Sequence, residues 1–214
     1  MNESIAALRQ EYTLATLRSS DVYLDPIQQF KKWFAEAQQS DIEDVNAMTL
    51  STVDANQKPH ARIVLLKGVE ETQFVFFTNY HSEKGKNIAS NPHVSLVFYW
   101  KELQRQIRIE GIAAKISEQA STDYFITRPI ASQLGAWASL QSEPLAKRED
   151  LETRFTSLEL KYQQQAIPKP SHWGGYAVSP TCIEFWQGRI SRLHDRIQYK
   201  LDENSVWKIG RLNP

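Results

Sequence analysis

The chain has 214 residues, and its 25 Lys plus Arg balance 25 Asp plus Glu, so its formal net charge is zero and a general polyanion binder is excluded. The length suits one domain with appendages, and the single cysteine, Cys182, permits no internal disulfide, as is usual in a reducing compartment. No apolar run approaches the roughly 20 residues that span a bilayer, and no secretory signal opens the chain, so we expect a cytoplasmic protein with neither nucleic acid nor membrane as a partner.

Two helices are predicted at the N-terminal end. Residues 4–17 carry apolar side chains at helical spacing. Asp25 and Pro26 form a typical helix start, because Asp accepts a backbone N–H as N-cap and Pro tolerates the first helical position. The apolar spacing continues this second helix to about Gln39, with an aromatic stripe that we expect in the core.

From Ala47 the apolar pattern changes to alternation, which is typical of half-buried strands. Short turn-like connections separate the strands, so we expect antiparallel pairing in a barrel or a curled sheet. The expected strands are residues 47–53, 60–67, 73–78, 94–100 and 104–116, followed by closing strands at 173–178, from 183, at 192–201 and at 206–212.

Three further helices are predicted between the strands. Ser82 opens a short one, whose free backbone N–H groups and Lys84 would suit a phosphate. Ser117 begins another, and Tyr124 and Arg128, four residues apart, would share its face before Pro129 ends it. A charged amphipathic helix is expected over residues 146–164.

The C-terminal stretch is the most informative one. If residues 192–197 form a strand, Arg192, His194 and Arg196 lie on one face, roughly 6–7 Å apart. Two guanidinium groups and an imidazole without an acidic neighbour on that face are costly unless an anion neutralises them. A solvated strand face is the plainer interpretation, but Trp186 offers an aromatic surface and favours a site for a flat, phosphorylated ligand.

Ile183-Glu-Phe-Trp186, five residues and then Arg192-Leu-His-Asp-Arg196 resemble the C-terminal signature of the pyridoxamine (pyridoxine) 5′-phosphate oxidases. Further similar motifs, in the family's order, are residues 8–12, 62–67 and 76–79. The resemblance implies a mainly β chain with flanking helices, folded as an FMN-binding split barrel of antiparallel strands. It implies one domain over residues 1–214, with an N-terminal helical segment 1–40 and a C-terminal signature region 171–214, and a homodimer with FMN at the subunit interface.

The resemblance also implies the reaction, namely FMN-dependent oxidation of pyridoxine or pyridoxamine 5′-phosphate by O2 to pyridoxal 5′-phosphate with release of H2O2. Two alternatives remain open. The chain could bind FMN or pyridoxal phosphate without turnover, or it could be another flavin oxidoreductase of the same fold. A metal site is not expected, because the five histidines are scattered and there is no cysteine cluster.

The family's site residues carry over position by position. Arg192 and His194 are expected nearest the reacting carbon, as catalytic residues, and whether His194 also takes a proton stays open. Arg9 and Tyr12 are expected to close over the substrate. FMN would be held by Arg62, Ile63, Val64, Leu65, Leu66, Lys67, Phe77, Thr78, Lys84, Gln106, Gln141, Ser142, Trp186 and Arg196, and the substrate by Arg9, Tyr12, Lys67, Tyr124, Arg128, Ser132, Arg192, Leu193 and His194.

Two positions depart from the simple pattern. The family has a basic residue immediately before the lysine that matches Lys84, whereas this chain has Glu83, so one phosphate contact is expected to be missing and FMN affinity to be weaker. Strict alternation places Arg62 and Lys67 on opposite faces of their strand. Both can reach one ligand only if the strand bends, bulges or ends there.

Overall fold

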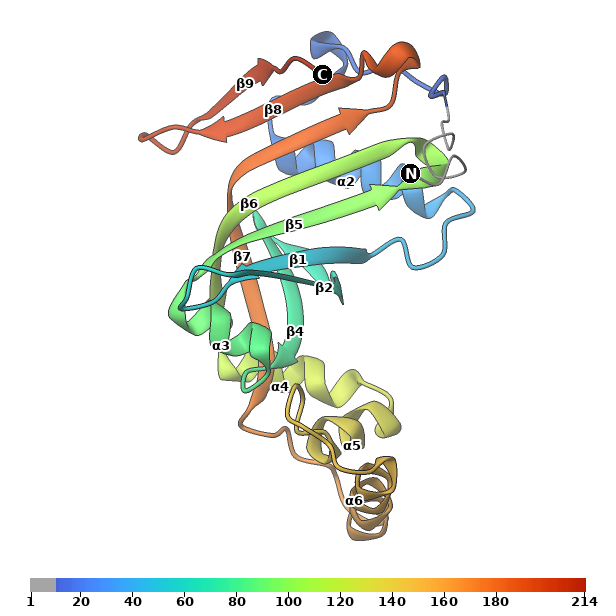
Figure 1. Ribbon diagram of the computed structural model, residues 1–214, viewed down its shortest axis with the longest axis vertical. Coiled ribbons are helices and arrows are strands. Elements are labelled where there is room, and N and C mark those ends of the chain that lie inside the picture. The colour runs from blue at the N-terminus through green and yellow to red at the C-terminus, as the bar shows by residue number, and fades with distance from the viewer. Residues whose placement is uncertain (1–10) are drawn as a thin grey trace, which may run out of the picture. The chain divides into compact units, whose positions relative to one another are not determined.

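The computed structural model describes residues 11–214, and over this part of the chain nine strands form one sheet (Figure 1). Its order is β2–β1–β5–β6–β7–β4–β3, with β8 paired to β7 and β9 to β8. The predicted fold class, mainly β with flanking helices, is confirmed. The strands are β1 (Ala47–Val53), β2 (Pro59–Leu65), β3 (Gly68–Glu70), β4 (Gln73–Asn79), β5 (His93–Trp100), β6 (Arg105–Lys115), β7 (Trp173–Gln187), β8 (Asp195–Leu201) and β9 (Trp207–Arg211).

The helices occupy the connections between these strands. They are α2 (Pro26–Gln38), α3 (Glu83–Ser90), α4 (Glu118–Thr127), α5 (Ile130–Ala138) and α6 (Arg148–Lys161). The chain divides into two compact units, one formed by the described part of residues 1–49 with 95–111 and 180–214, the other by 50–94 and 112–179. No helix within residues 11–214 is long and apolar enough to cross a membrane.

In the first unit, α2 begins where the sequence predicts. The Asp25 carboxylate accepts the Ile27 backbone N–H at 2.8 Å, and Pro26 takes the first helical position. The aromatic stripe is buried, because Phe30 packs against Phe98 with ring centroids 5.3 Å apart and is only 1% exposed. The stripe thereby fixes α2 on the strands of its own unit.

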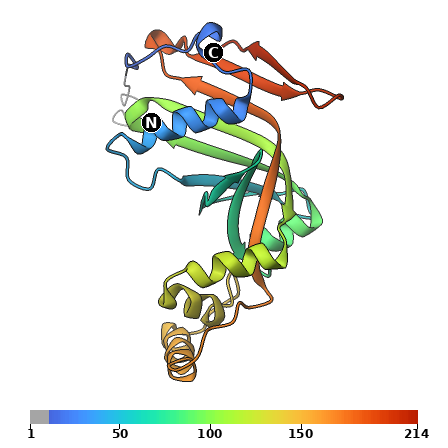
Figure 2. The same ribbon diagram turned by 180° about the vertical axis from the view of Figure 1, so that it is seen from behind.

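In the second unit, serine side chains cap two of the predicted helices. Ser82 accepts the Gly85 N–H at the start of α3, and Ser117 accepts the Ala120 N–H at 3.1 Å at the start of α4. Figure 2 shows α4 and α5 side by side in yellow-green. They enclose a small apolar core that consists of Phe125, Leu134, Ile167 and Trp173.

Several elements differ from the prediction. Residues 11–17 contain no helix, so the predicted helix 4–17 is wrong there, and its beginning lies outside the described residues. β7 is a single strand of 15 residues, although its sequence predicts two. β3 was not predicted, because three residues are too few for an alternation pattern, and it pairs antiparallel with β4.

Candidate active site

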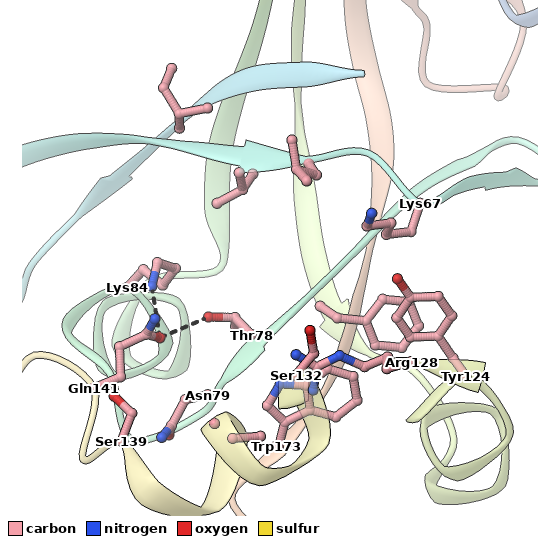
Figure 3. Close-up of a pocket in the computed structure, with 16 residues that line it drawn as sticks. Lys67, Thr78, Asn79, Lys84, Tyr124, Arg128, Ser132, Ser139, Gln141 and Trp173 are labelled. Atoms are coloured by element: carbon pink, nitrogen blue, oxygen red, sulfur yellow. Dashed lines mark hydrogen bonds between the residues drawn. The ribbon is translucent and has the colours of Figure 1, made fainter. Parts of the chain in front are cut away.

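The second unit contains a cavity of about 460 Å³, which lies among β2, β4, α4 and α5 (Figure 3). Most of its lining was predicted from the sequence. The predicted lining residues are Ile63, Val64, Leu65, Lys67, Phe77, Thr78, Lys84, Tyr124, Arg128, Ser132 and Gln141, and those that were not predicted are Asn79, Gly135, Ala136, Ser139 and Trp173.

One side of this cavity holds a half-buried arginine side chain against aromatic rings. The Arg128 guanidinium lies 4.6 Å from the centroid of the Trp173 ring, and Phe77 stacks on Trp173 and on Tyr124 at centroid distances of 5.3 and 3.9 Å. Nη1 of Arg128 is buried and has no hydrogen-bond partner among the described residues. Burial lowers the pKa of Arg128, yet a guanidinium keeps its proton in proteins.

A buried cationic donor without a partner is unfavourable, and an anion that reaches it removes the cost. Lys67, Tyr124 and Ser132 line the same cavity and add an ammonium and two hydroxyl groups, as Figure 3 shows. Four donors of this kind suit a dianionic phosphate with its three terminal oxygens. This side of the cavity therefore has the chemistry of a phosphate site.

The route by which Arg128 reaches the cavity differs from the prediction. α4 ends at Thr127, and Arg128 follows it with φ −73° and ψ 148°, an extended conformation favoured before Pro129. The expected helical pairing of Tyr124 with Arg128 is therefore wrong, although both side chains line the cavity. Gln133 Nε2 donates to the Arg128 carbonyl at 2.8 Å and holds this turn in place.

The other side of the cavity gathers donors around Gln141. Its Oε1 accepts from Lys84 Nζ at 3.1 Å and from Thr78 Oγ1 at 3.3 Å (Figure 3). Burial, with the Arg62 charge adding to it, lowers the pKa of Lys84. A Cβ at Gly85 would lie 2.2 Å from the Tyr80 carbonyl oxygen, so only glycine lets α3 start this close to the end of β4. Thr78 and Lys84 thus direct their two donors to one point, which suits an acceptor oxygen of a ligand.

The two departures noted in the sequence are visible here. β2 ends at Leu65, so Lys67 lies beyond the strand and lines the cavity. Arg62 is not among the lining residues, because its Nη1 donates to Thr52 Oγ1 at 2.7 Å and to two backbone carbonyls. Glu83 Oε1 lies 3.3 Å from Nδ1 of His60. The position before Lys84 thus carries a carboxylate that faces β2.

The residues of the C-terminal signature lie in the first unit, and their arrangement corrects the prediction. Residues 192–194 are not a strand, because β8 begins at Asp195, and Ser191 and Arg192 have φ of 55° and 61°. Arg196 does not share an anion-seeking face with them. Its Nε and Nη2 donate to the Glu184 carboxylate at 2.7 and 3.0 Å.

The sequence pattern did not link Glu184 to Arg196, because Glu184 lies on the neighbouring strand. β7 and β8 pair so that Glu184 is opposite Gln198 and Trp186 opposite Arg196, which is one diagonal step from Glu184. This carboxylate, 4% exposed, is the main reason that the pKa of Arg196 is raised. A bidentate ion pair on the sheet replaces the predicted cationic row.

His194 is fixed in one tautomer by its surroundings. The Arg189 backbone N–H donates to Nδ1 of His194 at 3.1 Å, so Nδ1 is an acceptor and the ring proton is on Nε2. Burial and the nearby Arg192 lower the pKa of His194. The ring centroid lies 4.6 Å from that of Trp186, and Tyr12 packs edge-on at 5.8 Å from both rings. His194 therefore presents an N–H donor at Nε2.

The remaining predicted residues are placed as follows. Gln106 is half-buried on β6 of the first unit, and Leu193 is 68% exposed. Ser142 is exposed and left-handed, with φ 71°, and Leu66 is 6% exposed. Arg9 lies outside the described residues. The structure thus gathers one predicted set around the cavity and another around Trp186.

The chain was compared with known protein families. The family model described as pyridoxamine 5′-phosphate oxidase matches residues 34–163, and one described as the pyridoxine 5′-phosphate oxidase C-terminal dimerisation region matches residues 173–214. The pyridoxine/pyridoxamine 5′-phosphate oxidase of Nostoc punctiforme is 53% identical over the full length of both chains. That of Leptospira interrogans is 51% identical, again over both full lengths.

Solved structures agree with these matches. PhzG from Burkholderia lata, solved with tetrahydrophenazine-1-carboxylic acid, is 27% identical, with a TM-score of 0.89 over 96% of this chain and 100% of that one. An FMN-binding protein of Nostoc punctiforme related to pyridoxamine 5′-phosphate oxidase shares the fold, with a TM-score of 0.72 at 18% identity over 90% and 100% of the two chains. The split-barrel prediction is thereby confirmed. The chain belongs to the pyridoxamine 5′-phosphate oxidase family and is an FMN-dependent oxidase.

Proposed function

We propose that this oxidase converts pyridoxine 5′-phosphate and pyridoxamine 5′-phosphate to pyridoxal 5′-phosphate. The alcohol or amine carbon at the 4′ position becomes an aldehyde, O2 is reduced to H2O2, and the amine substrate also takes up water and releases ammonia. Full-length relatives at about half identity carry both substrates in their names, which supports this choice.

The observation that carries the proposal is the Arg128 Nη1, which has no partner within the described part of the chain and lies in a cavity that also presents Lys67, Tyr124 and Ser132. A substrate phosphate would satisfy this donor, and a bidentate guanidinium contact would fix its orientation. The stacked rings of Phe77, Tyr124 and Trp173 leave an apolar wall beside it. A flat pyridine ring attached to the phosphate suits such a wall.

The cofactor residues fit FMN in chemistry. Thr78 near the end of β4 supplies a hydroxyl, and Lys84 supplies an ammonium at the start of α3, where backbone N–H groups favour an anion. Gln141 Oε1 accepts hydrogen bonds from both donors, and both donors would turn to the ligand when it binds. When bound, FMN supplies the two-electron acceptor that no side chain of the chain provides. The match to a dimerisation region supports the further proposal of a homodimer with FMN at the subunit interface.

The chain's own groups would bind and orient the substrate. We propose that Arg128, Lys67, Tyr124 and Ser132 hold its phosphate. The Nε2–H of His194 would donate a hydrogen bond to an oxygen or ring nitrogen of the substrate, rather than take a proton, because Nδ1 is already engaged by Arg189. Orientation of this kind contributes several kcal/mol where reacting atoms are held close.

The structural relative PhzG offers a second substrate class, because its bound ligand carries a carboxylate and no phosphate. The cluster around Arg128 favours a phosphate ligand, because a single carboxylate has too few oxygens to pair with all four donors. A steady-state assay of peroxide and pyridoxal 5′-phosphate formation distinguishes these possibilities. We expect turnover with both phosphorylated substrates and a loss of at least about a hundredfold in kcat/KM with unphosphorylated pyridoxine. Equal kcat/KM for phosphorylated and unphosphorylated pyridoxine would contradict the phosphate site.

Replacing Glu83 by Arg is expected to tighten FMN binding by about five- to tenfold. The change removes a negative charge beside Lys84 and adds a positive one, which at an exposed position is worth about 1 kcal/mol. Quenching of flavin fluorescence on titration measures the dissociation constant. Glu159→Arg makes the same change of charge on α6 and should leave affinity unaltered, and the gain at position 83 should shrink in high salt. Unchanged affinity in Glu83→Arg would show that Glu83 lies too far from the phosphate to matter.

A further inference from the structure

The turn that carries Arg192 has an unusual backbone. Ser191 and Arg192 are both left-handed, with φ of 55° and 61°, and neither is glycine or asparagine. Two consecutive residues of this kind are unfavourable for L-amino acids and persist only where surrounding contacts hold them. The Arg192 guanidinium forms no hydrogen bond or ion pair with residues 11–214, so its own side chain does not hold the turn.

One contact that holds the turn lies within it, because the Leu193 backbone N–H donates to the Ile190 carbonyl at 3.1 Å. A second contact comes from the N-terminal segment. Glu11 Oε2 accepts the backbone N–H of Ser191 at 3.0 Å. This N–H belongs to the first of the two left-handed residues, so the bond stabilises the unfavourable conformation where it begins. The pair is 180 positions apart in sequence, and both residues belong to the first unit.

The same segment is attached at the other end of the turn. The Leu17 backbone N–H donates to Asp195 Oδ2 at 3.1 Å, and Arg211 Nη2 donates to the Leu17 carbonyl at 2.8 Å. Arg189 and Arg211 also donate to Asp195, at 2.9 and 2.7 Å. Asp195 is therefore a firm anchor for the C-terminal end of the turn, and Glu11 acts on its other end.

Tyr12, the next residue after Glu11, closes the space between these attachments. Its ring packs against Trp186 and His194. A Cβ at Gly188 would lie 2.7 Å from Cγ of Tyr12, so only glycine allows the ring to settle there. The packing of Tyr12 places the Glu11 carboxylate within reach of Ser191.

We propose that Glu11 is a positioning residue, whose carboxylate holds the Ser191–Arg192 turn left-handed and thereby aims Arg192 and His194 at the substrate. The proposal rests on the proposed function for what Arg192 and His194 do, and adds the residue that sets their backbone. Glu11 acts through this hydrogen bond and not as an acid or a base.

Three variants of the FMN-loaded protein test this. Glu11→Ala is expected to lower kcat/KM for pyridoxine 5′-phosphate by about tenfold, which corresponds to about 1.4 kcal/mol. The FMN dissociation constant should be unchanged, because the lost hydrogen bond to the carboxylate acts on the turn alone. Glu11→Gln keeps an acceptor oxygen and should recover most of the loss. Glu11→Ala combined with Ser191→Gly should recover at least about threefold, because glycine adopts the left-handed conformation without penalty. The exposed Glu43→Ala is the matched control and should behave as wild type.

Amide hydrogen exchange of residues 188–193 provides a readout that does not depend on turnover. Exchange at Ser191 should be at least about tenfold faster in Glu11→Ala than in wild type and protected in Glu11→Gln. If the wild type fails to oxidise pyridoxine 5′-phosphate, the proposed function is wrong, and this exchange pattern still tests the role of Glu11. The role is refuted if Glu11→Ala matches Glu43→Ala in kcat/KM and exchange. It is also refuted if Glu11→Gln loses as much as Glu11→Ala and glycine at 191 recovers nothing.

Discussion

Arg128→Met is expected to raise the KM for pyridoxine 5′-phosphate by about a hundredfold or more, with little change in kcat and in FMN affinity. Hydrogen bonds to charged groups contribute about 1.5–3 kcal/mol each, and about 1.4 kcal/mol is a factor of ten. Two such bonds to a phosphate account for the effect. The phosphate is remote from the reacting carbon, so the same binding energy is lost in the ground state and in the transition state. The loss therefore appears as a higher KM, while kcat changes little.

The same variant makes a second, opposite prediction for stability. In the ligand-free protein the Arg128 Nη1 donor is buried and has no hydrogen-bond partner among residues 11–214, and Met removes that donor while its thioether packs on Trp173. The free energy of unfolding should therefore rise by about 1 kcal/mol, measured by denaturant titration. Arg148→Met, at an exposed ion pair on α6, controls for loss of an arginine. A stable Arg128→Met protein with wild-type KM would contradict the phosphate assignment.

Replacements of His194 are expected to separate its two nitrogens. Asn places an acceptor where Nδ1 meets the Arg189 N–H but has no donor at the Nε2 position, whereas Gln reaches the Nε2 position with an N–H. If the Nε2 donor orients the substrate, His194→Asn should lose about a hundredfold in kcat/KM and His194→Gln about tenfold, since one such bond is worth about 1.5–3 kcal/mol. Stopped-flow reduction of the bound flavin measures this. Equal losses, with Asn no worse than Gln, would contradict the donor role.

The pH dependence follows from the same geometry. Burial and then Arg192 lower the pKa of His194 from 6.5, so the neutral ring is the favoured form in the folded protein. Its contribution to the free energy of unfolding is complete above pH 6.5 and is lost as the pH falls through the lowered value, because the unfolded chain binds the proton more tightly. We expect kcat/KM to be flat above this range and to fall below it, because a protonated Nδ1 no longer accepts the Arg189 N–H that orients the ring. His194→Gln should abolish that fall, since glutamine does not titrate.

Much of the fold and the cavity could be predicted because local chemistry determines it. Asp25 before Pro26 begins α2, and Ser82 and Ser117 cap α3 and α4, as their side chains dictate. Alternation located β1 without error. The residues around Arg128 came from the family's motifs, and the structure gathers them, since they lie on neighbouring elements of one unit.

The remainder depends on contacts that no local pattern contains. The left-handed turn at Ser191 contains neither glycine nor asparagine, which would have marked it in the sequence, and a carboxylate 180 positions away accepts its Ser191 N–H. The alternation rule therefore extended β8 too far towards its N-terminus. Arg196 seemed free because its partner, Glu184, is brought close only by the pairing of β7 with β8.

Trp173 shows the same limit within the cavity. It begins a strand and looks like core, and only the structure shows that its ring supports the Arg128 guanidinium. Ser139 likewise carries no pattern that marks it as a lining residue. Arg62 does not line the cavity, because Thr52, on the adjacent strand, accepts its hydrogen bond.

The most direct test of the account is an anaerobic half-reaction. Protein loaded with FMN is mixed with one equivalent of pyridoxine 5′-phosphate without oxygen, and the visible flavin absorbance is recorded. We expect the flavin band to bleach, pyridoxal 5′-phosphate to form in equal amount, and air to restore the band with release of peroxide. A flavin that stays oxidised while pyridoxine 5′-phosphate binds tightly would contradict it and would leave a binding protein without turnover.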